Sequence, residues 1–419
     1  MASHVGRRRR AARAAIILAL LALLALLAGC GSGKGRSSPT GATAQAKGCA
    51  ATVADVLSRV VRRVYREGVH SERTEVAQRA IATSLPLRRA VESADPAAAR
   101  AAAEALVAAG HMTNLRIVRA GRTLADVGGP AVTPLTGTLT DATGAPIATY
   151  TTSVWSDAGF LAESDSIAGG RVSLRVHGHT VGGSFRLPAG RLPAAGSIVV
   201  GGVPYRYASF GAKVYPAGAA RVYILRPLSS INQLCGASDE DTTVNVLSHI
   251  ATLIYDAEGG ARTAPQVRRV QSDQPLLVAV ARRDPVAATA AVNTLLNQHI
   301  VRLRVYAGGT PLTDVGGPFV LAPVSAPLRV GGHAIGSIVL SIQDDEGYLR
   351  LTQRLVGLRV LMYMNSQLVK NSLGPEPGAV PESGRYVYRG STYRVFTLHA
   401  RAFPSGPLTV RVLIPIPYA

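Results

Sequence analysis

Residues 124–130 read LADVGGP, and residues 312–318 read LTDVGGP. Two glycines permit positive φ, the proline prevents continued strand pairing, and the aspartate can accept a hydrogen bond from a downstream backbone N–H. We therefore expect each stretch to end a β-strand and to redirect the chain. The alternative, that the stretch contacts a ligand, is the less favoured interpretation.

The repetition extends far beyond this turn. At the same spacing of 188 positions, the matched pairs are His111 and His299, Leu115-Arg116 and Leu303-Arg304, Gly121 and Gly309, Ser153 and Ser341, Asp157 and Asp345, Gly159 and Gly347, Gly169 and Gly357, and Tyr205-Arg206 and Tyr393-Arg394. Residues 56–58 and Tyr65 match residues 246–248 and Tyr255 at a spacing of 190. The sequence predicts a duplication, with copy 1 at residues 49–228 and copy 2 at residues 235–419.

Within a copy, helical periodicity comes first. It covers residues 50–67, 70–83 and 95–109, and after residue 112 the helices are expected to stop. Strands are then expected at residues 115–119, from Leu124 onward, and at 148–155, 170–176, 198–209 and 220–225, separated by Gly, Pro, Asn or Asp. Helices followed by an antiparallel sheet predict the α+β fold class in both copies.

The N-terminus is typical of an exported lipoprotein. Five arginines lie between residues 7 and 13, and an uncharged Ala/Leu/Ile run covers residues 14–28. The run ends at Leu27-Ala28-Gly29-Cys30, which resembles the lipobox of bacterial lipoproteins. We expect residues 1–29 to be a signal peptide, Cys30 to carry the lipid, and residues 30–48 to be a flexible tether on the extracytoplasmic face of the cell membrane. The alternative is an uncleaved signal anchor.

The net charge is strongly positive, at +20, and comes from 41 Arg and only 4 Lys. Basicity of this size normally raises nucleic acid as a partner, but export argues against nucleic acid. We interpret the charge as a solvated surface that can also be attracted to anionic lipids or wall polymers. Lipidation of Cys30 leaves Cys49 and Cys235, which are expected to pair in an oxidising compartment.

Two motifs carry a family resemblance. Residues Leu115–Pro130 follow the pattern hydrophobic-x-x-x-Gly-x-x-Leu-x-Asp, residues Ser153–Leu161 read as a strand pair with Ser-Val-x-x-Asp-x-Gly-Phe, and both recur at Leu303–Pro318 and Ser341–Leu349. With helices placed before the sheet, this chain resembles the extracytoplasmic Cache domains, which are PAS-like, of bacterial sensors. The resemblance covers nearly all of the chain after the tether.

The resemblance implies tandem sensor domains, each binding a small molecule between the sheet and its overlying loops and helix. Domains of that family normally transmit their signal through a membrane helix to a kinase or chemoreceptor. This sequence has no apolar span after residue 30, and the last expected strand, residues 408–416, lies close to its end. We expect no output module of its own, and a membrane protein as partner. The Arg-x-Trp-Tyr arrangement of the amino-acid-binding members is absent.

No catalytic motif supports an enzyme, and no cofactor is expected. His177 and His179 would share one face of a strand and could ligate a metal, but copy 2 has Asn365 and Gln367 there, so two exposed imidazoles on an edge strand are favoured and no metal is expected. His111 and His299 follow a helix, where interaction with the helix C-terminus is favoured over catalysis. The acidic residues 239–241 are expected to complement the N-terminal dipole of a helix.

Aromatic and arginine side chains on the sheet are the remaining candidates for ligand binding, because Arg pairs with carboxylates and aromatic rings supply apolar walls. The candidates are Trp155, Asp157, Tyr205, Arg206, Tyr207, Tyr393 and Arg394. The alternative is ordinary alternation, in which Tyr205 and Tyr207 face the core while Arg206 faces water. The leading hypothesis is a lipid-anchored, sensor-like protein that binds a small molecule. The other is an envelope structural or adaptor protein that uses its repeats for protein contacts.

Overall fold

The computed structural model describes residues 40–110, 112–260, 263–296, 299–404 and 406–418. The expected signal peptide, Cys30, the first part of the tether and His111 lie outside these residues. For the rest of the tether the prediction of a flexible segment is wrong, because helix α2 (Thr40–His70) includes residues 40–48. This segment is rich in alanine, the best helix former, and it extends a helix that the buried turns after it nucleate.

Four helices open copy 1: α2, α3 (Glu72–Thr83), α4 (Leu85–Glu92) and α5 (Pro96–Ala108). The last three begin at Ser71, Ser84 and Asp95, whose side chains accept hydrogen bonds from N–H groups of the first turn. The helical segment is therefore present as predicted, with α4 in addition. Among the described residues, no helix combines the length and the apolar character that crossing a membrane requires.

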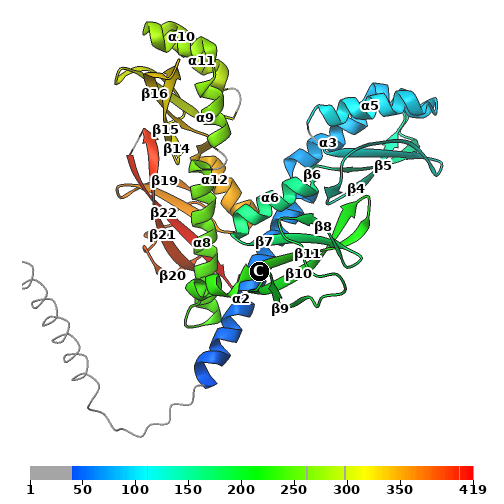
Figure 1. Ribbon diagram of the computed structural model, residues 1–419, viewed down its shortest axis with the longest axis horizontal. Coiled ribbons are helices and arrows are strands. Elements are labelled where there is room, and N and C mark those ends of the chain that lie inside the picture. Colours follow the sequence, from blue (N-terminus) through cyan, green and yellow to red (C-terminus); the bar gives the residue numbers. More distant parts are fainter. Residues whose placement is uncertain (1–39, 111, 261–262, 297–298, 405, 419) are drawn as a thin grey trace, which may run out of the picture. The chain divides into compact units, whose positions relative to one another are not determined.

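The first sheet of copy 1 has the order β2-β1-β5-β4 and is antiparallel throughout. Its strands are β1 (Asn114–Arg119), β2 (Arg122–Gly128), β4 (Leu135–Thr140) and β5 (Pro146–Ser153). Helices α3, α4 and α5 contact this sheet (Figure 1). The core between them includes Ile81 and Leu87 from the helices and Leu115 and Ile117 from β1, all fully buried.

The second sheet of copy 1 has the order β6-β3-β10-β11-β7-β8, and β9 pairs with β10. Its strands are β3 (Ala131–Val132), β6 (Trp155–Ser156), β7 (Arg171–Val176), β8 (His179–Gly183), β9 (Ala195–Val200), β10 (Val203–Tyr215) and β11 (Gly218–Pro227). The expectation of one sheet per copy is therefore wrong, because copy 1 holds two. The chain of copy 1 passes between the two sheets three times, at residues 129–130, at residues 133–134 and at Val154.

Helix α6 (Asp157–Ala168) lies between β6 and β7, so the helices do not stop at residue 112 and the expected strand pair at Ser153–Leu161 is wrong. The Ser156 side chain accepts a hydrogen bond from Gly159 N–H and starts the helix. Gly169 ends it in the left-handed conformation, with φ of 55°. These cap signals overrule the strand-like alternation of the residues before them.

Copy 2 repeats this architecture. Helices α7 (Leu228–Ile231) and η1 (Asn232–Leu234) lead into α8 (Asp239–Gly259), α9 (Ala264–Gln271), α10 (Gln274–Arg282) and α11 (Pro285–Leu296). The first sheet holds β12 (Arg302–Ala307), β13 (Thr310–Gly316), β15 (Val324–Val330) and β16 (His333–Ser341) in the order β13-β12-β16-β15. This is the strand order of the first sheet of copy 1.

The second sheet of copy 2 has the order β17-β14-β21-β22-β18-β19, with β20 on β21. Its elements are β14 (Phe319–Leu321), β17 (Gln343–Asp344), α12 (Asp345–Leu351), η2 (Thr352–Val356), β18 (Arg359–Met364), β19 (Gln367–Asn371), β20 (Gly384–Tyr388), β21 (Ser391–Pro404) and β22 (Gly406–Ile416). The order again matches copy 1 strand for strand. The predicted α+β class and the tandem duplication are confirmed.

The repeated turn ends a strand in each copy, as predicted. Gly128 (φ 93°) and Gly316 (φ 134°) are the last residues of β2 and β13. A Cβ at these positions would lie 2.2 Å from the carbonyl oxygen of Thr113 and 2.4 Å from that of Val301. Only glycine allows this approach.

The aspartate of the turn acts differently from the expectation that it caps its own backbone. Asp126 accepts a hydrogen bond from the Tyr215 hydroxyl on β10 of the other sheet. Asp314 pairs with Arg302 and Arg304, at 2.8 and 2.6 Å, and both guanidinium groups lie over the ring of Phe403 on β21. Tyr215 and Phe403 are equivalent positions, so in both copies the aspartate joins the two sheets.

The second sheets of both copies share one core with α2 and α8. The fully buried side chains of α2 in this core are Val53, Val56, Leu57, Val60, Val61 and Val64, and those of α8 include Val246, Leu247 and Ile250. A disulfide joins Cys49 and Cys235, as predicted, with the Cα atoms 5.7 Å apart. Closing a loop of this size stabilises a fold by about 5 kcal/mol in the chain-entropy model.

The contact between the copies is the same contact made twice. Gly169, after α6 of copy 1, lies against Leu253 of α8, and Gly357, after η2 of copy 2, lies against Arg63 of α2. The two glycines are equivalent positions, and so are Arg63 and Leu253. Such a reciprocal arrangement is the hallmark of a two-fold dimer interface, which here lies within one chain.

Candidate functional site

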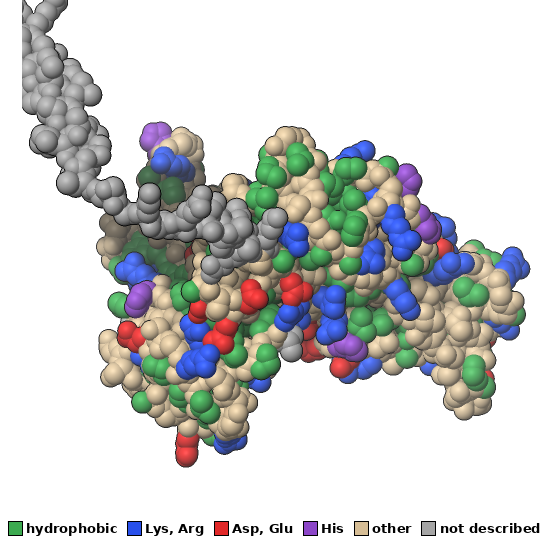
Figure 2. Space-filling view, turned by 90° about the horizontal axis from the view of Figure 1, so that it is seen from below, with side chains coloured by type: hydrophobic (Ala, Val, Ile, Leu, Met, Phe, Trp, Pro, Cys, Tyr) green, Lys and Arg blue, Asp and Glu red, His purple; other side chains and the backbone are tan. Residues whose placement is uncertain are grey.

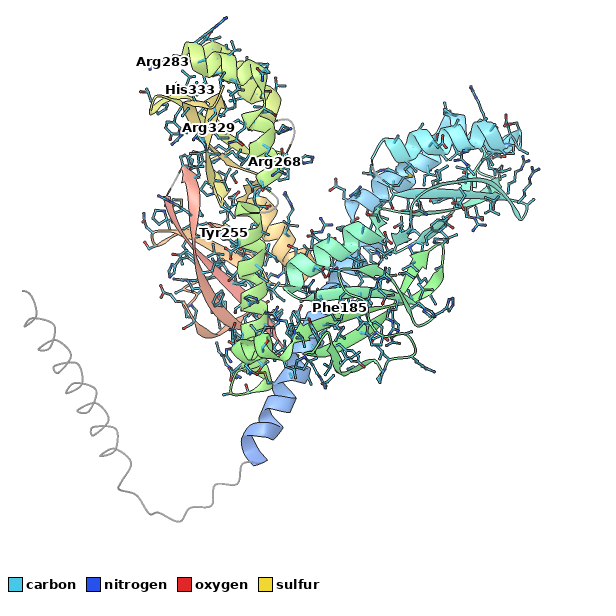
Figure 3. The ribbon with its side chains drawn as sticks, in the orientation of Figure 1. Phe185, Tyr255, Arg268, Arg283, Arg329 and His333 are labelled. Atoms are coloured by element: carbon cyan, nitrogen blue, oxygen red, sulfur yellow. A yellow bond between two sulfur atoms is a disulfide. The ribbon has the colours of Figure 1, made fainter. Side chains whose placement is uncertain are left out.

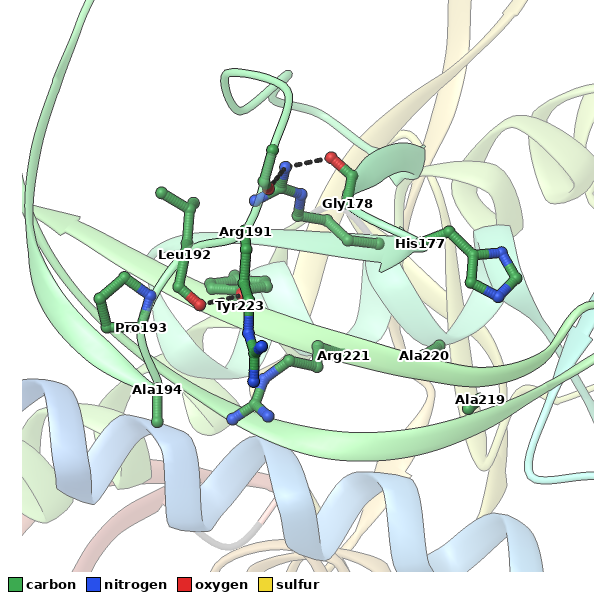
Figure 4. Close-up of a pocket in the computed structure, with 12 residues that line it drawn as sticks. His177, Gly178, Arg191, Leu192, Pro193, Ala194, Ala219, Ala220, Arg221 and Tyr223 are labelled. Carbon is green, nitrogen blue, oxygen red and sulfur yellow. Dashed lines mark hydrogen bonds between the residues drawn. The ribbon is translucent and has the colours of Figure 1, made fainter.

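A groove of about 590 Å³ lies on the second sheet of copy 1. Strand β11 shows which face carries it: Val222 and Ile224 point into the shared core, whereas Tyr223 and Leu225 belong to a separate cluster on the opposite side. Strands β7 and β11 form the floor, and the segment 188–194 closes one side (Figure 4). We call this cavity the β7–β11 groove.

Arg175 fixes the wall of the groove. It is only 3% exposed, and its Nη2 donates to the carbonyl oxygens of Gly178, Pro188 (2.7 Å) and Gly190 (2.8 Å). Its guanidinium lies over the ring of Tyr223, with Cζ 5.5 Å from the ring centroid. Tyr223 in turn donates from its hydroxyl to the Leu192 carbonyl at 3.2 Å. The position of segment 188–194 is therefore set by two side chains of the sheet.

Two further arginines line the groove. In Figure 4 the guanidinium groups of Arg191 and Arg221 point toward each other across the groove. Arg221 donates from Nε to Ser209 Oγ at 3.3 Å, and no acidic side chain is among the groove's lining residues. Neighbouring cations without an acid make a positive potential that attracts an anion. The rest of the lining is largely apolar, with Leu192, Pro193 and Ala194 on one side.

Arginines also gather on α2, where Arg59, Arg62, Arg63 and Arg66 line a pocket of about 290 Å³ together with Asp55 and Ser58. On the face drawn in Figure 2, Lys and Arg side chains are scattered, and several lie beside acidic side chains. This distribution agrees with the interpretation of most of the charge as a solvated surface. The β7–β11 groove differs from the arginine-lined pocket of α2 because its lining residues include no acid, whereas Asp55 lines the other pocket.

Tyr205 and Tyr207, two of the predicted ligand residues, lie together beside the groove. Both are buried in the same cluster as Tyr223, and the rings of Tyr207 and Tyr223 are 5.8 Å apart. Phe185, visible in Figure 3, packs on Tyr205 at 5.1 Å. Burial raises the pKa of Tyr207, which stays a neutral phenol at ordinary pH.

Arg206 lies between these tyrosines in β10 and therefore points to the other face of the sheet, where Nη1 donates to Ser197 Oγ at 3.4 Å. The alternation that was set against ligand binding at Tyr205–Tyr207 is thus present in β10. The structure does not bring Arg206 into the groove.

The other candidates lie elsewhere. Trp155 packs between the shared core and the core of the first sheet, and Asp157 is in the first turn of α6, where Oδ1 accepts from Ala158 N–H at 2.7 Å. Tyr393 packs against a cluster in copy 2. Arg394 pairs with Glu240 (2.8 Å) and Asp241 (3.1 Å), in the first turn of α8. The hydrogen bond from Arg394 holds the pKa of Glu240 below its usual range.

The histidines singled out in the sequence do not lie together in one site. His177, with φ of 49°, lines the rim of the β7–β11 groove, and His179 begins β8 and is exposed. In the part of the chain that the structure describes, no group of three or more His, Cys, Asp or Glu side chains is placed to hold a metal ion. His299 is exposed after α11, and its interaction with the helix end stays a prediction.

The equivalent surface of copy 2 has a different charge. There, Arg411 lies over the ring of Tyr363 at 4.4 Å, so that arginine and tyrosine have exchanged positions relative to Arg175 and Tyr223. Arg411 donates to the Val380 carbonyl and lies 3.9 Å from Glu382. The positions of Arg191 and Arg221 are taken by Ala379 and Thr409. Only copy 1 therefore carries the pair of arginines.

Sequence reasoning missed Arg175, Arg191 and Arg221. Arginine on a strand normally indicates a solvated face, so Arg175 and Arg221 gave no distinct signal. Arg191 belongs to a segment without periodicity, whose position follows from the hydrogen bonds of Arg175. A comparison of the two copies could have found them, because Ala379 and Thr409 show that the fold does not require arginine at two of these positions.

No family model and no curated protein matches the sequence. Among solved structures, the periplasmic domain of Vibrio cholerae LuxQ matches with a TM-score of 0.28 and 14% identity, over 40% of this chain and 97% of that domain. An extracellular ligand binding receptor from Desulfohalobium retbaense DSM5692 matches with a TM-score of 0.26 and 11% identity, over 54% of this chain and 47% of the receptor. These scores are low, so the fold assignment rests on the strand order of the chain itself.

Proposed function

We propose that this protein is an extracytoplasmic, sensor-like protein that binds a small anionic molecule in the β7–β11 groove. It acts by binding and not by catalysis. A lipid on Cys30 would hold it at the membrane, and a separate membrane protein would receive its signal. The observation that carries the proposal is the pair Arg191 and Arg221 beside an apolar wall, without an acidic side chain in the lining.

The groove suits a ligand of this class. A volume of about 590 Å³ is within the range of small-molecule sites, which combine apolar walls with a few placed polar groups. Guanidinium groups bind carboxylates and phosphates through paired N–H donors. Arg175 and Tyr223 hold the wall in place, so the site is largely formed before a ligand arrives.

The test is calorimetric titration of the mature chain, made with Cys30→Ser, against a panel of mono- and dicarboxylates and inorganic phosphate. We expect at least one anion to bind with a stoichiometry of one per chain. Arg221→Ala should weaken binding by at least tenfold, because a charge-assisted hydrogen bond contributes about 1.5–3 kcal/mol. Arg206→Ala, on the opposite face, is the matched control. Binding that Arg221→Ala leaves unchanged would place the ligand elsewhere, and a panel without any binder would favour the adaptor hypothesis.

A further inference from the structure

A second groove, of about 720 Å³, runs along α8. Arg226 of β11, with Gln233 and Leu234 of η1, forms one side, and residues of β21 with Glu382 and Ser383 form the other. We call it the α8 groove. It differs from the β7–β11 groove in its chemistry, and nothing in the proposed function makes use of it.

Neutral hydrogen-bonding side chains dominate the α8 groove. Helix α8 contributes Asn245, Ser248, His249 and Thr252, whose spacing of three, four and seven positions places them on one face. Gln233, Ser383 and Thr397 add three more from the other elements. The lining contains a single cation, Arg226, and a single acid, Glu382, whose side chain is 76% exposed.

His249 adds to the neutral character. Burial, followed by the nearby charge of Arg226, lowers the pKa of His249, and Asp256 offsets only part of this effect. The imidazole is therefore neutral at ordinary pH and offers one donor and one acceptor. Arg226 itself is held by hydrogen bonds from Nη1 to the carbonyl oxygens of Ala168 (3.3 Å) and Gly169 at the end of α6.

Two buried polar atoms of the lining residues lack a hydrogen-bond partner. They are Ser248 Oγ and Arg226 Nε, in residues that are each 8% exposed. A buried polar atom without a partner costs about 1–3 kcal/mol. Both residues line the α8 groove, and the chain itself supplies no partner for these two atoms.

Helix α2, the equivalent of α8 in copy 1, shows that the fold does not require this neutral face. At a spacing of 190, Asn245, His249 and Thr252 correspond to Asp55, Arg59 and Arg62 of α2. Arg59 and Asp55 form an ion pair on that helix. Copy 2 thus carries uncharged hydrogen-bonding groups where copy 1 carries charges, while Ser58 and Ser248 are the same residue at equivalent, buried positions.

We propose that the α8 groove binds a neutral carbohydrate of one or two sugar rings. Sugar hydroxyls both donate and accept, and amide, hydroxyl and neutral imidazole side chains match them without the desolvation of a charge. Phe396, which is only partly buried, lines the groove and offers an apolar surface to the C–H face of a sugar ring. The volume suits a ligand of this size.

The experiment is isothermal titration of the mature Cys30→Ser chain with glucose, galactose, N-acetylglucosamine and maltose. At least one of these sugars should bind, and Asn245→Ala should weaken it by about tenfold, the effect of one lost hydrogen bond to a ligand. Asn245 is exposed, so its replacement leaves the core intact. Asp55→Ala, at the equivalent position of α2, is the matched control and should leave sugar binding unchanged.

A second variant separates this site from the anion site. Arg221→Ala should leave sugar binding unchanged, because Arg221 lies in the β7–β11 groove. The proposal is overturned if none of the four sugars binds, if both Asn245→Ala and Ser248→Ala bind sugar as the parent does, or if Asp55→Ala weakens sugar binding as much as Asn245→Ala. Failure of anion binding at Arg221 would not affect these outcomes.

Discussion

Replacing Gly128 by alanine tests the role of the repeated turn. Gly128 has φ of 93°, a conformation that costs an L-residue about 1–2 kcal/mol. The new Cβ would lie 2.2 Å from the carbonyl oxygen of Thr113 and 2.6 Å from the Cα of Asn114. Both atoms belong to the backbone, so β1 must shift, at a further cost of about 1–3 kcal/mol.

Part of this cost is offset in the unfolded chain, where alanine has less conformational freedom than glycine by about 0.4–1 kcal/mol. We therefore expect Gly128→Ala to lower the free energy of unfolding by about 2–4 kcal/mol. Gly129→Ala is the matched control. It has no heavy atom within 4 Å of the added Cβ, and its φ is not positive. It should be neutral or slightly stabilising.

Urea unfolding followed by circular dichroism measures both variants. With an m-value of about 2–3 kcal/mol/M, the midpoint of the transition should fall by about 1 M for Gly128→Ala and stay within error for Gly129→Ala. Equal midpoints for the two variants would refute the reasoning. Gly316→Ala and Gly317→Ala in copy 2 repeat the comparison, because Gly316 has the same close approach to Val301.

Three further predictions concern single contacts. Reduction of the Cys49–Cys235 disulfide should lower the free energy of unfolding by about 5 kcal/mol, measured by urea unfolding with and without reductant, and an unchanged midpoint would contradict it. Burial, together with the hydrogen bond to Asp126, raises the pKa of Tyr215 to about 12, so the stability from this group is complete below the unfolded pKa of 10.0 and is lost as the pH rises from there through about 12. Tyr215→Phe should make the fall in thermal stability over this pH range smaller, because Tyr418, whose pKa is also raised to about 12, still contributes to it; a profile like the parent's would argue against the role of Tyr215. Arg175→Ala should cost about 2–3 kcal/mol and make residues 184–194 sensitive to protease, because three carbonyl oxygens lose the charged donor that holds them; unchanged protease resistance would count against this role.

The sequence was sufficient for the parts of the fold that depend on local signals. The spacing of 188 predicts the duplication, and the apolar face of residues 53–64 predicts the buried helix α2. The Gly-Gly-Pro stretch predicts the end of a strand, because its conformational limits belong to the residues themselves. Two cysteines in a chain that is expected to be exported were enough to predict the disulfide.

The parts that failed depend on contacts between distant residues or on competing local signals. Asp126 bonds to Tyr215, which is 89 positions away, so its role as a link between sheets could not be read from the turn. Helix α6 was missed because the capping signals of Ser156 and Gly169 compete with a strand-like alternation just before them. The division of copy 1 into two sheets follows from three short connections, at residues 129–130, at residues 133–134 and at Val154, which are too short to be recognised as boundaries in the sequence.

The candidate site depends most on contacts that the sequence does not show. Of the predicted ligand residues, Tyr205 and Tyr207 lie beside the β7–β11 groove, whereas Arg394 pairs with the acidic first turn of α8 and Trp155 packs in a core. The sequence around an arginine does not show whether an acidic side chain will pair with it in the folded protein. That information is carried by pairs such as Arg394 with Glu240, 154 positions apart.

The reciprocal contact of Gly169 and Gly357 with the two long helices has an evolutionary consequence. In an assembly of two identical chains, every mutation arrives on both sides at once, and a change that helps one half must be tolerated by the other. Here a mutation changes one copy only, and the other copy keeps its side of the interface. That freedom explains how arginines accumulated on one member of the pair and uncharged amides and hydroxyls on the other, without loss of the seam between them.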